Sequence, residues 1–455
     1  MDLPLVLDAA HGGVTDQVTA ALRHAVLTRT LAAGTTLPAS RRLAQDLGVS
    51  RGVVVEAYYR LTAEGFLVAR QGSGTVVAGA ADLEPAPAPR AAPPPAQQVR
   101  YQLRPGVPDL SLFPRTQWLA RMRHTLATVP NDAFGYADPG GVLALRQEVS
   151  GYLNRVRAAR ATPDRVVVVA GVALALSLIV RSLRADGRSR IAVEDPSGIA
   201  YQELLVESGA DLVHVPVDDE GLDVSALERS GADAVVLTPA HQFPTGVVLS
   251  PARRAALVTW ARATGGHIIE DDYDAEFRFD RDPVGSLQGL LPSHVTLTGS
   301  VSKALSPGLR LGWMLAPPAL ADGVRRLRSL LDLGSPVPEQ YALARFLADG
   351  GYDRHLRRAR GVYRRRRDAL ATALARHLPQ AHVQGISAGL HLYARLPDGV
   401  DDVAVAAAAL DRGVNVFPIS PMRTAPGSPG LVIGFAGEPE QRLAEAVRVL
   451  ASVAR

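Results

Sequence analysis

The sequence contains no cysteine, which excludes disulfide bonds and thiolate metal sites and removes the usual sign of a secreted protein. The N-terminal stretch has no basic segment followed by a long apolar core, so we expect no signal peptide. The longest uncharged apolar run, residues 166–180, is too short to span a bilayer. We therefore expect a cytoplasmic protein without a membrane segment.

Composition is typical of a multidomain globular protein. Hydrophobic residues make up 47% and charged residues 21% of the 455 residues, which predicts roughly two to four domains with a large buried core. The net charge of +4 is compatible with nucleic-acid binding and does not require it. The positions of the basic residues are therefore more informative than their total.

The first part of the chain predicts three helices and a hairpin. Apolar residues recur at helical spacing over residues 14–30, and a second helix is predicted from Ser40, as its cap, through Leu47. A third helix is predicted to follow its cap Ser50, with a buried stripe at Val54, Ala57, Tyr58 and Leu61. Two β-rich runs in residues 66–77 then favour a hairpin wing. This order is that of a winged helix-turn-helix, which we expect at residues 10–78.

Arginines mark the helix starts of this block. Arg41 and Arg42 open the second helix and Arg51 opens the third, where helix N-termini and guanidinium groups together hold phosphates and read base edges. A generic three-helix bundle remains the alternative. The segment LPASRRLAQDLGVSRGVVVEAYYRLTAEGFLVARQGSGT resembles the GntR-type winged helix, although Gly52 and Val55 depart from residues common in that family. The residues expected at double-stranded operator DNA are Arg41, Arg42, Ser50, Arg51, Gly52, Val53, Gln71 and Gly72.

The amino-acid composition changes after residue 78, and the pattern of apolar residues changes again after residue 100. Residues 79–100 are rich in Pro and Ala without apolar periodicity, which predicts an extended linker. Beyond it, strand-like runs alternate with helical segments, which favours an α/β domain with a mostly parallel sheet at residues 101–455. We expect strands at residues 166–169, 191–193, 213–215, 234–237, 267–269, 295–298 and 313–315. The arginine-rich segment 354–367 fits a DNA contact or a solvated helix face, and we favour the second.

Two motifs lie where predicted strands end. Residues 296–312 place Ser300, Ser302 and Lys303 in a turn followed by Arg310, which suits a reactive amine beside a phosphate, although a polar surface loop is the plain alternative. Residues 268–279 place Asp271 at a strand end, where an ionised carboxylate holds the proton of a pyridinium nitrogen, with Tyr273 close enough to reach the same ring. An acidic turn or a metal site is the alternative there. No cysteine or spaced histidine pair accompanies the carboxylates, so we predict no metal.

Together with TPAHQFPTG at residues 238–246, these motifs resemble those of a fold-type I pyridoxal-phosphate aminotransferase. Their residues are similar to those of MocR/GabR-type regulators. The resemblance implies pyridoxal 5'-phosphate on Lys303, a large part at about 141–340, a smaller C-terminal α+β part at about 341–455, and a head-to-tail homodimer. It also implies that Tyr136 touches the phosphate of the partner's cofactor. Gly171, Val172 and Ala173 follow a strand and open a helix, so their N–H groups suit a phosphate, with a tight strand-to-helix turn as the plain alternative.

Three positions depart from a working transaminase. The segment 194–199 lacks the aromatic residue that stacks on the pyridine, for which Tyr201 is a possible replacement, and Phe243 stands in place of an Asn. Residues 431–437 lack the arginine that clamps a substrate carboxylate, with Arg423 the nearest candidate for an effector contact. We therefore assign no catalytic residue, apart from Lys303 if any transamination remains. The sequence favours a transcription regulator that senses a small amine, amino acid or B6 vitamer, with an aminotransferase carrying an accessory DNA-binding domain, or a dimerising scaffold, as alternatives.

Overall fold

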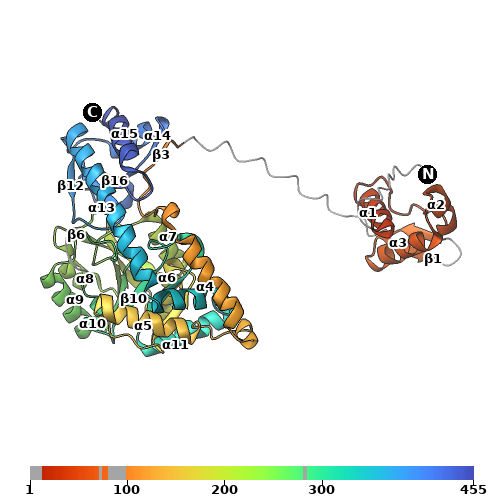
Figure 1. Cartoon of the computed structure of the whole chain (residues 1–455), viewed down its shortest axis with the longest axis horizontal. Helices are drawn as coiled ribbons and strands as arrows, with labels where there is room; N and C mark the ends of the chain where they lie inside the picture. Colours follow the sequence, from red (N-terminus) through yellow and green to blue (C-terminus); the bar gives the residue numbers. More distant parts are fainter. Residues whose placement is uncertain (1–12, 71–73, 80–98, 280–283, 455) are drawn as a thin grey trace. The chain divides into compact units, whose positions relative to one another are not determined.

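The chain divides into two compact units in the computed structural model, Met1–Ala96 and Gln97–Arg455. The structure describes residues 13–70, 74–79, 99–279 and 284–454 (Figure 1). The two units are described separately. Among the described residues, we find no helix with the length and apolarity needed to cross a bilayer.

The first unit is three helices and a two-stranded wing. Its elements are α1 (Val14–Leu27), α2 (Ser40–Asp46), α3 (Arg51–Ala63), β1 (Leu67–Arg70) and β2 (Gly74–Val77). The predicted stripe of α3 is buried against α1 and α2. β1 and β2 pair antiparallel with Leu67 opposite Val77, so the expected winged helix-turn-helix is present.

Local details of the helix starts differ from the prediction. Ser40 is the first residue of α2 and not its cap, because the carbonyl of Ala39 accepts hydrogen bonds from the N–H groups of Arg42 and Leu43. Ser50 does precede α3, but its side chain makes no capping hydrogen bond. Helix α1 ends at Leu27, earlier than expected. Gln71 and Gly72, predicted at DNA, lie outside the described residues.

The second unit is built on an eight-stranded sheet with the order β4-β11-β10-β9-β8-β5-β6-β7. Strands β10, β9, β8, β5 and β6 are parallel neighbours, and β11 is antiparallel to both β10 and β4. Each strand expected from the sequence is confirmed. The strands are β4 (Val166–Val169), β5 (Arg190–Asp195), β6 (Asp211–Asp218), β7 (Gly221–Leu222), β8 (Ala234–Leu237), β9 (His267–Asp271), β10 (Val295–Ser300) and β11 (Gly312–Leu315).

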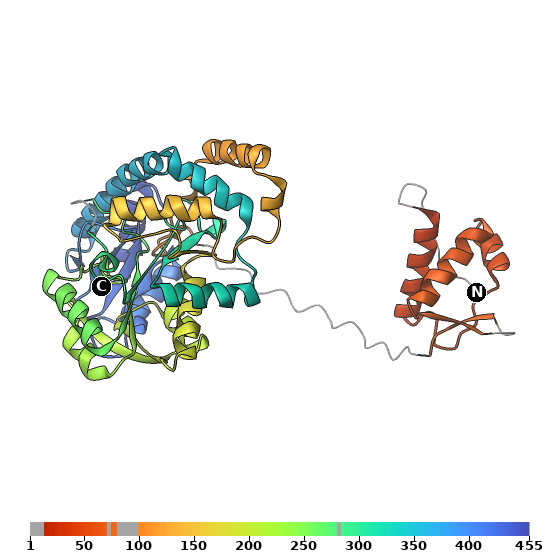
Figure 2. The ribbon, with the colours of Figure 1, turned by 90° about the horizontal axis from the view of Figure 1, so that it is seen from below.

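Helices cover both faces of this sheet (Figure 2). Side chains of α6, α7 and α11 pack with one set of alternate strand residues. The other set packs against α5, α12 and α13 near β4, β11 and β10, and against α8, α9 and α10 near β5 and β8. The helices are α4 (Arg115–Thr128), α5 (Leu143–Arg157), α6 (Val172–Ala185), α7 (Ile199–Glu207), α8 (Val224–Ser230), α9 (Pro251–Thr264), α10 (Leu287–Leu290), α11 (Pro318–Leu331), α12 (Val337–Ala348) and α13 (Gly351–His377), with 3-10 turns η1 (Leu110–Leu112), η2 (Asn131–Phe134) and η3 (Pro307–Leu309).

A smaller antiparallel sheet, β12-β13-β16-β15, forms the C-terminal lobe. Strand β3 (Tyr101–Gln102) pairs with β14, so the start of the second unit joins this lobe and not the large one. The remaining elements are β12 (His382–Gln384), β13 (His391–Arg395), α14 (Asp402–Asp411), β14 (Val414–Asn415), β15 (Phe417–Pro418), η4 (Ser420–Met422), β16 (Gly430–Gly434) and α15 (Glu440–Ala451).

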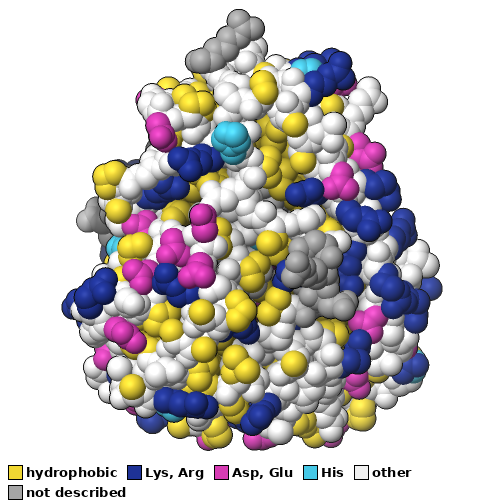
Figure 3. All heavy atoms as spheres, turned by 90° about the vertical axis from the view of Figure 1, so that its left-hand side faces the viewer, with side chains coloured by type: hydrophobic (Ala, Val, Ile, Leu, Met, Phe, Trp, Pro, Cys, Tyr) yellow, Lys and Arg dark blue, Asp and Glu magenta, His cyan; other side chains and the backbone are white. Residues whose placement is uncertain are grey.

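The arginine-rich helix α13 is partly committed to internal contacts. Arg360 donates to the carbonyl of Glu276, Arg366 pairs with Asp109 at 2.8 Å, and Arg365 pairs with Glu440 at 3.1 Å. Acidic and basic side chains are interspersed over the face shown in Figure 3. These arginines contact other parts of the second unit, and the preference for a solvated helix face over a DNA contact stays a prediction.

Candidate functional site

A cavity of about 420 Å³ lies where the parallel strands of the large sheet end. Ligands of open α/β sheets bind at this edge because helix N-termini and loops converge there. Three of the predicted cofactor-binding residues line the cavity, namely Lys303, Asp271 and Tyr273. They come from the turn after β10 and from the end of β9, which are neighbouring parallel strands.

Lys303 lines this cavity, and its side chain is partly buried. Its Nζ donates a hydrogen bond to the carbonyl of Gly106 at 2.6 Å. Burial lowers the pKa of Lys303, although the carboxylates of Asp274 and Asp271 act in the opposite direction. A lowered pKa increases the fraction of neutral amine that can attack a carbonyl. The sequence contains no other lysine, a signal of its importance that motif spacing does not reveal.

Asp271 is the acidic residue of its motif that lines the cavity. Glu270 accepts from the N–H groups of Leu287 and Gln288, and Asp272 forms a two-pronged pair with Arg157 with both contacts at 2.7 Å. Asp271 accepts a weak hydrogen bond from Thr298, at 3.4 Å, and a hydrogen bond from the hydroxyl of Tyr201. Burial, followed by repulsion from Asp272 and Asp274, raises the pKa of Asp271 to about 7. A cationic ring nitrogen placed here relieves that penalty.

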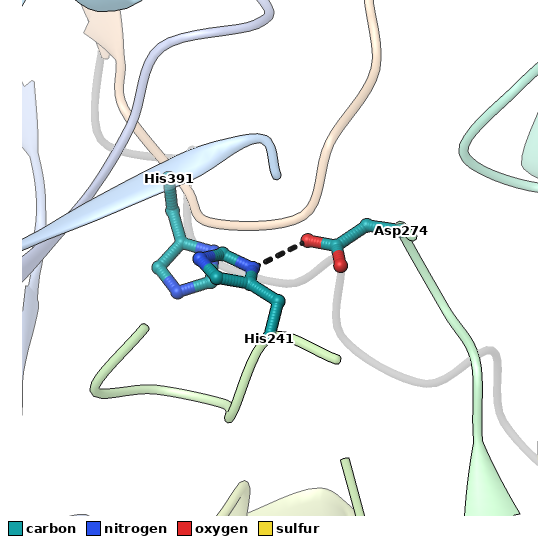
Figure 4. A group of neighbouring side chains, drawn as sticks. All are labelled: His241, Asp274 and His391. Carbon is teal, nitrogen blue, oxygen red and sulfur yellow. Dashed lines mark hydrogen bonds and ion pairs between the residues drawn. The ribbon is translucent and has the colours of Figure 1, made fainter. Parts of the chain in front are cut away.

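Tyr273 contacts a buried cluster of three residues. Figure 4 shows the cluster, which consists of His241, Asp274 and His391. Nδ1 of His241 lies 2.9 Å from Asp274 Oδ2 and 3.1 Å from the Tyr273 hydroxyl. Nε2 of His391 lies 3.2 Å from the carbonyl of Pro244, and burial followed by His241 lowers the pKa of His391 well below its ordinary value. The atoms of these three residues that could bind a metal ion lie within 4.8 Å of one another. The sequence led us to predict no metal site, and the spacing of the three residues along the chain could not reveal this cluster. The hydrogen bonds within the cluster fix Tyr273 at the cavity wall.

Arg310 and Gly171 form a second group of predicted residues, and neither is among the residues that line this cavity. A Cβ on Gly171 would lie 2.9 Å from Nη2 of Arg310, and the positive φ of +97° at Gly171 also favours glycine. Arg310 donates to the carbonyl of Ala170, directly before the N-terminus of α6, where Val172 and Ala173 lie. An arginine at a helix N-terminus, with space that a Cβ would fill, fits a phosphate. Ser300 is buried beside the turn and its Oγ accepts from the N–H of Ser302 at 3.3 Å.

Tyr136 and Arg423 were named from the sequence but are not among the residues that line this cavity, whereas Tyr201 is. Tyr136 is 92% exposed. Arg423 lines a different pocket. Tyr201 lines the cavity, and the charge of Asp271, followed by burial, raises the pKa of Tyr201 well above its ordinary value. β16, which spans most of the segment without the expected arginine, belongs to the small sheet.

Sequence reasoning missed Arg104 and Glu194, which also line the cavity. Arg104 follows β3, an element too short to be predicted, and lies over the ring of Phe417 at 5.9 Å. Glu194 accepts from the N–H and hydroxyl of Thr238, and burial raises the pKa of Glu194 to about 7. The TPAHQFPTG motif held Thr238 and His241, but their partners are distant in sequence.

The predicted DNA-binding arginines differ from the structural arginines of the same unit. Arg23 pairs with Glu64, and Arg60 pairs with Asp16 and Glu56. Arg41, Arg42 and Arg51 are exposed and take part in no ion pair within the described part of the unit. Ser50, Gly52 and Val53 lie at the start of α3 with Arg51. The helix starts therefore present unneutralised positive charge.

Two family models match the sequence. The model of bacterial regulatory proteins, gntR family, matches residues 14–77, and the model of aminotransferase class I and II matches residues 108–450. An archaeal alanine:glyoxylate aminotransferase has a similar solved structure, with a TM-score of 0.73 and 26% identity over 79% of this chain and 91% of that chain.

Curated relatives match nearly the full length. The HTH-type pyridoxine biosynthesis transcriptional regulator PdxR of Corynebacterium glutamicum is 35% identical over 97% of this chain and 96% of its own. The probable rhizopine catabolism regulatory protein MocR of Rhizobium meliloti is 33% identical over 95% of this chain and 92% of its own. The chain therefore belongs to the family of HTH-type transcription regulators of the MocR and PdxR kind, in which a gntR-family domain precedes an aminotransferase class I and II domain.

Proposed function

We propose that the second unit binds pyridoxal 5'-phosphate on Lys303 and that this regulator senses a small amine, amino acid or B6 vitamer. The observation that carries the proposal is the partly buried amine of the single lysine, which shares a cavity with Asp271, the carboxylate of the acidic motif that lines it. The similarity to aminotransferases supports the same cofactor. We place the protein in the cytoplasm, where it meets its operator DNA.

Each residue group has a distinct role in this proposal. Asp271 holds a proton on the ring nitrogen, and Tyr273, oriented by His241, donates to the ring oxygen. Arg310, Ser300, Ser302 and the N-terminus of α6 at Gly171, Val172 and Ala173 hold the phosphate. When bound, the cofactor supplies an aldehyde and an electron sink for amine chemistry.

Sensing is favoured over turnover. Transamination needs a substrate held with its α-proton toward Lys303, and β16 carries no arginine for the substrate carboxylate. Loss of that positioning removes much of the roughly 7–11 kcal/mol that orientation supplies. The second candidate function is an aminotransferase with an accessory DNA-binding domain, and Arg104 at the cavity is the observation that favours it.

A homodimer is part of the proposal. Tyr136 is exposed and suits a contact with the partner's cofactor phosphate, in a head-to-tail arrangement. Exposed apolar side chains on α4, on α11 and near Tyr136 support a covered surface, among them Leu119, Leu126, Phe134, Leu143, Leu330 and Leu331. A dimer also gives two winged helices for two half-sites of double-stranded DNA, read by Arg41, Arg42, Ser50, Arg51, Gly52 and Val53.

The test uses the single lysine. The full chain is incubated with pyridoxal 5'-phosphate, reduced with borohydride, and analysed by intact and peptide mass. We expect one adduct, on the peptide that contains Lys303, and none in Lys303→Arg, which keeps the positive charge without a comparable nucleophile. An adduct that persists in Lys303→Arg, or no adduct in the unaltered chain, contradicts the assignment.

A further inference from the structure

A second pocket, of about 250 Å³, lies between the large and small lobes of the second unit. Asp195 and Pro196 line this pocket, whereas Glu194 and Ser197, directly before and after them, line the cofactor cavity. Among the described residues none lines both. The small lobe contributes Gln384, Tyr393 and the loop 423–427, so a ligand here touches both lobes.

Arg423 supplies an unneutralised positive charge to this pocket. Its Nε is buried without a hydrogen-bond partner among the described residues, and its Nη2 reaches the Tyr393 hydroxyl only at 3.4 Å. The guanidinium packs against Gly427, where a Cβ would overlap Nη1. A guanidinium with an open donor and no carboxylate partner is suited to a carboxylate ligand.

The same pocket contains carboxylates that a simple anion would meet. Asp219 accepts from Gln384 at 3.1 Å and has no cationic partner within the described structure. Asp218 pairs with Arg253 at 2.7 Å, and Asp195 accepts from the N–H and hydroxyl of Thr424. A ligand with only a negative charge is repelled by Asp219, and one with only a positive charge is repelled by Arg423. A ligand that carries both charges satisfies the two groups.

We propose that this pocket binds a small zwitterion, such as an amino acid, with its carboxylate on Arg423 and its ammonium toward Asp219. The inference rests on the proposed function, since it names the ligand class of the sensing unit. It places the ligand outside the cofactor cavity, so binding requires no reaction at Lys303.

Two segments of the pocket wall continue into the wall of the cofactor cavity, and hydrogen bonds join these segments. The N–H of Ser197 donates to the carbonyl of Met422 at 3.0 Å, and both residues line the cofactor cavity next to pocket residues. The Asp195 to Thr424 bonds join the same two segments. A zwitterion that bridges the lobes therefore favours one lobe arrangement through its differential contacts.

The test measures binding of glycine, L-alanine and L-leucine to the full chain by calorimetry, with acetate and methylammonium as single-charge probes. Cofactor-free Lys303→Ala is used throughout, so that no amine can form an imine with the cofactor. We expect at least one amino acid to bind while the single-charge probes bind at least about 10-fold more weakly. Arg423→Gln should weaken binding at least about 10-fold. Gly427→Ala, which displaces the guanidinium and keeps its charge, should also weaken it.

Two arginine variants are matched controls. Arg412→Gln alters an exposed arginine outside the pocket, and Arg104→Gln alters the cofactor cavity; both should leave binding unchanged. The inference is overturned if no amino acid binds, if acetate binds as tightly, or if Arg104→Gln weakens binding and Arg423→Gln does not. The proposed function fails separately, through absence of the Lys303 adduct, whatever this pocket binds.

Discussion

Replacing Asp271 by Asn should stabilise the cofactor-free protein and weaken cofactor binding. The carboxyl group of Asp271 is buried at the end of β9 and has no strong ion-pair partner, in contrast to Asp272 beside it, which is paired with Arg157. Without a ligand, the ionised group carries a desolvation cost that an amide does not. With the pyridine ring bound, the same charge becomes favourable.

The expected gain in stability of Asp271→Asn follows from the raised pKa of Asp271. Burial, followed by Asp272 and Asp274, raises the pKa of Asp271 from 3.8 to about 7, and about 1.4 kcal/mol for each pKa unit gives an upper limit of about 4 kcal/mol. Coupling to the neighbouring carboxylates and imperfect amide hydrogen bonds reduce the expected gain to roughly 1–3 kcal/mol. Since the folded pKa is the higher one, the cost is absent below about pH 4 and complete above about pH 7.

The assay is denaturant unfolding of the cofactor-free full chain at about pH 5 and about pH 8, following the transition of the second unit. Asp271→Asn should gain most of its stability at the higher pH, and its affinity for pyridoxal 5'-phosphate should fall at least about 100-fold. Asp272→Asn is the matched control, and it should destabilise by about 3–5 kcal/mol because it leaves buried Arg157 unpaired. The reasoning is refuted if Asp271→Asn destabilises the cofactor-free protein at about pH 8, or if its gain is the same at both pH values.

Three further predictions concern the phosphate, the DNA and the dimer. Gly171→Val should weaken cofactor binding at least about 10-fold, because a Cβ there meets Arg310 and the positive φ is strained; unchanged affinity in a cofactor titration would contradict this. Arg51→Ala should reduce discrimination between selected and random duplexes by about 1–3 kcal/mol, whereas Arg41→Ala should weaken binding to both and flatten the salt dependence; equal losses in anisotropy titrations would remove the distinction. Tyr136→Ala should release cofactor faster from the dimer, and an unchanged dissociation rate would place Tyr136 outside the partner's site.

The sequence located much of the scaffold because its signals are local. The sheet strands are short apolar runs between turn residues, and Lys303 and Asp271 were both expected where strands of a mostly parallel sheet end. The structure brings them to one cavity because β9 and β10 are parallel neighbours. The different hydrogen-bond and ion-pair partners of Glu270, Asp271 and Asp272 were not predictable. They include Arg157 and the N–H groups that follow Ser286, which tertiary packing alone brings to these carboxylates.

Other features were missed for the same reason. Ser40 has the residue type of a helix cap, but the backbone turns one residue earlier and the prediction was wrong. Arg104 reaches the cavity only because the two-residue strand β3 joins β14, which lies more than three hundred residues later in the chain. Arg423 was identified as the nearest substitute for a missing arginine, whereas the structure places it in a separate pocket.

The central claim is that ligand recognition by the second unit alters DNA binding without steady turnover. The most direct measurement is the affinity of the cofactor-loaded full chain for a duplex that it has selected from a random pool, with and without each amino acid, amine and B6 vitamer of a panel. Transamination of the same compounds with 2-oxo acids is followed in parallel. The account predicts that one compound changes DNA affinity at least about 5-fold where turnover is negligible. Multiple turnover of a common amino acid, with DNA affinity indifferent to the whole panel, would contradict it and favour the enzyme.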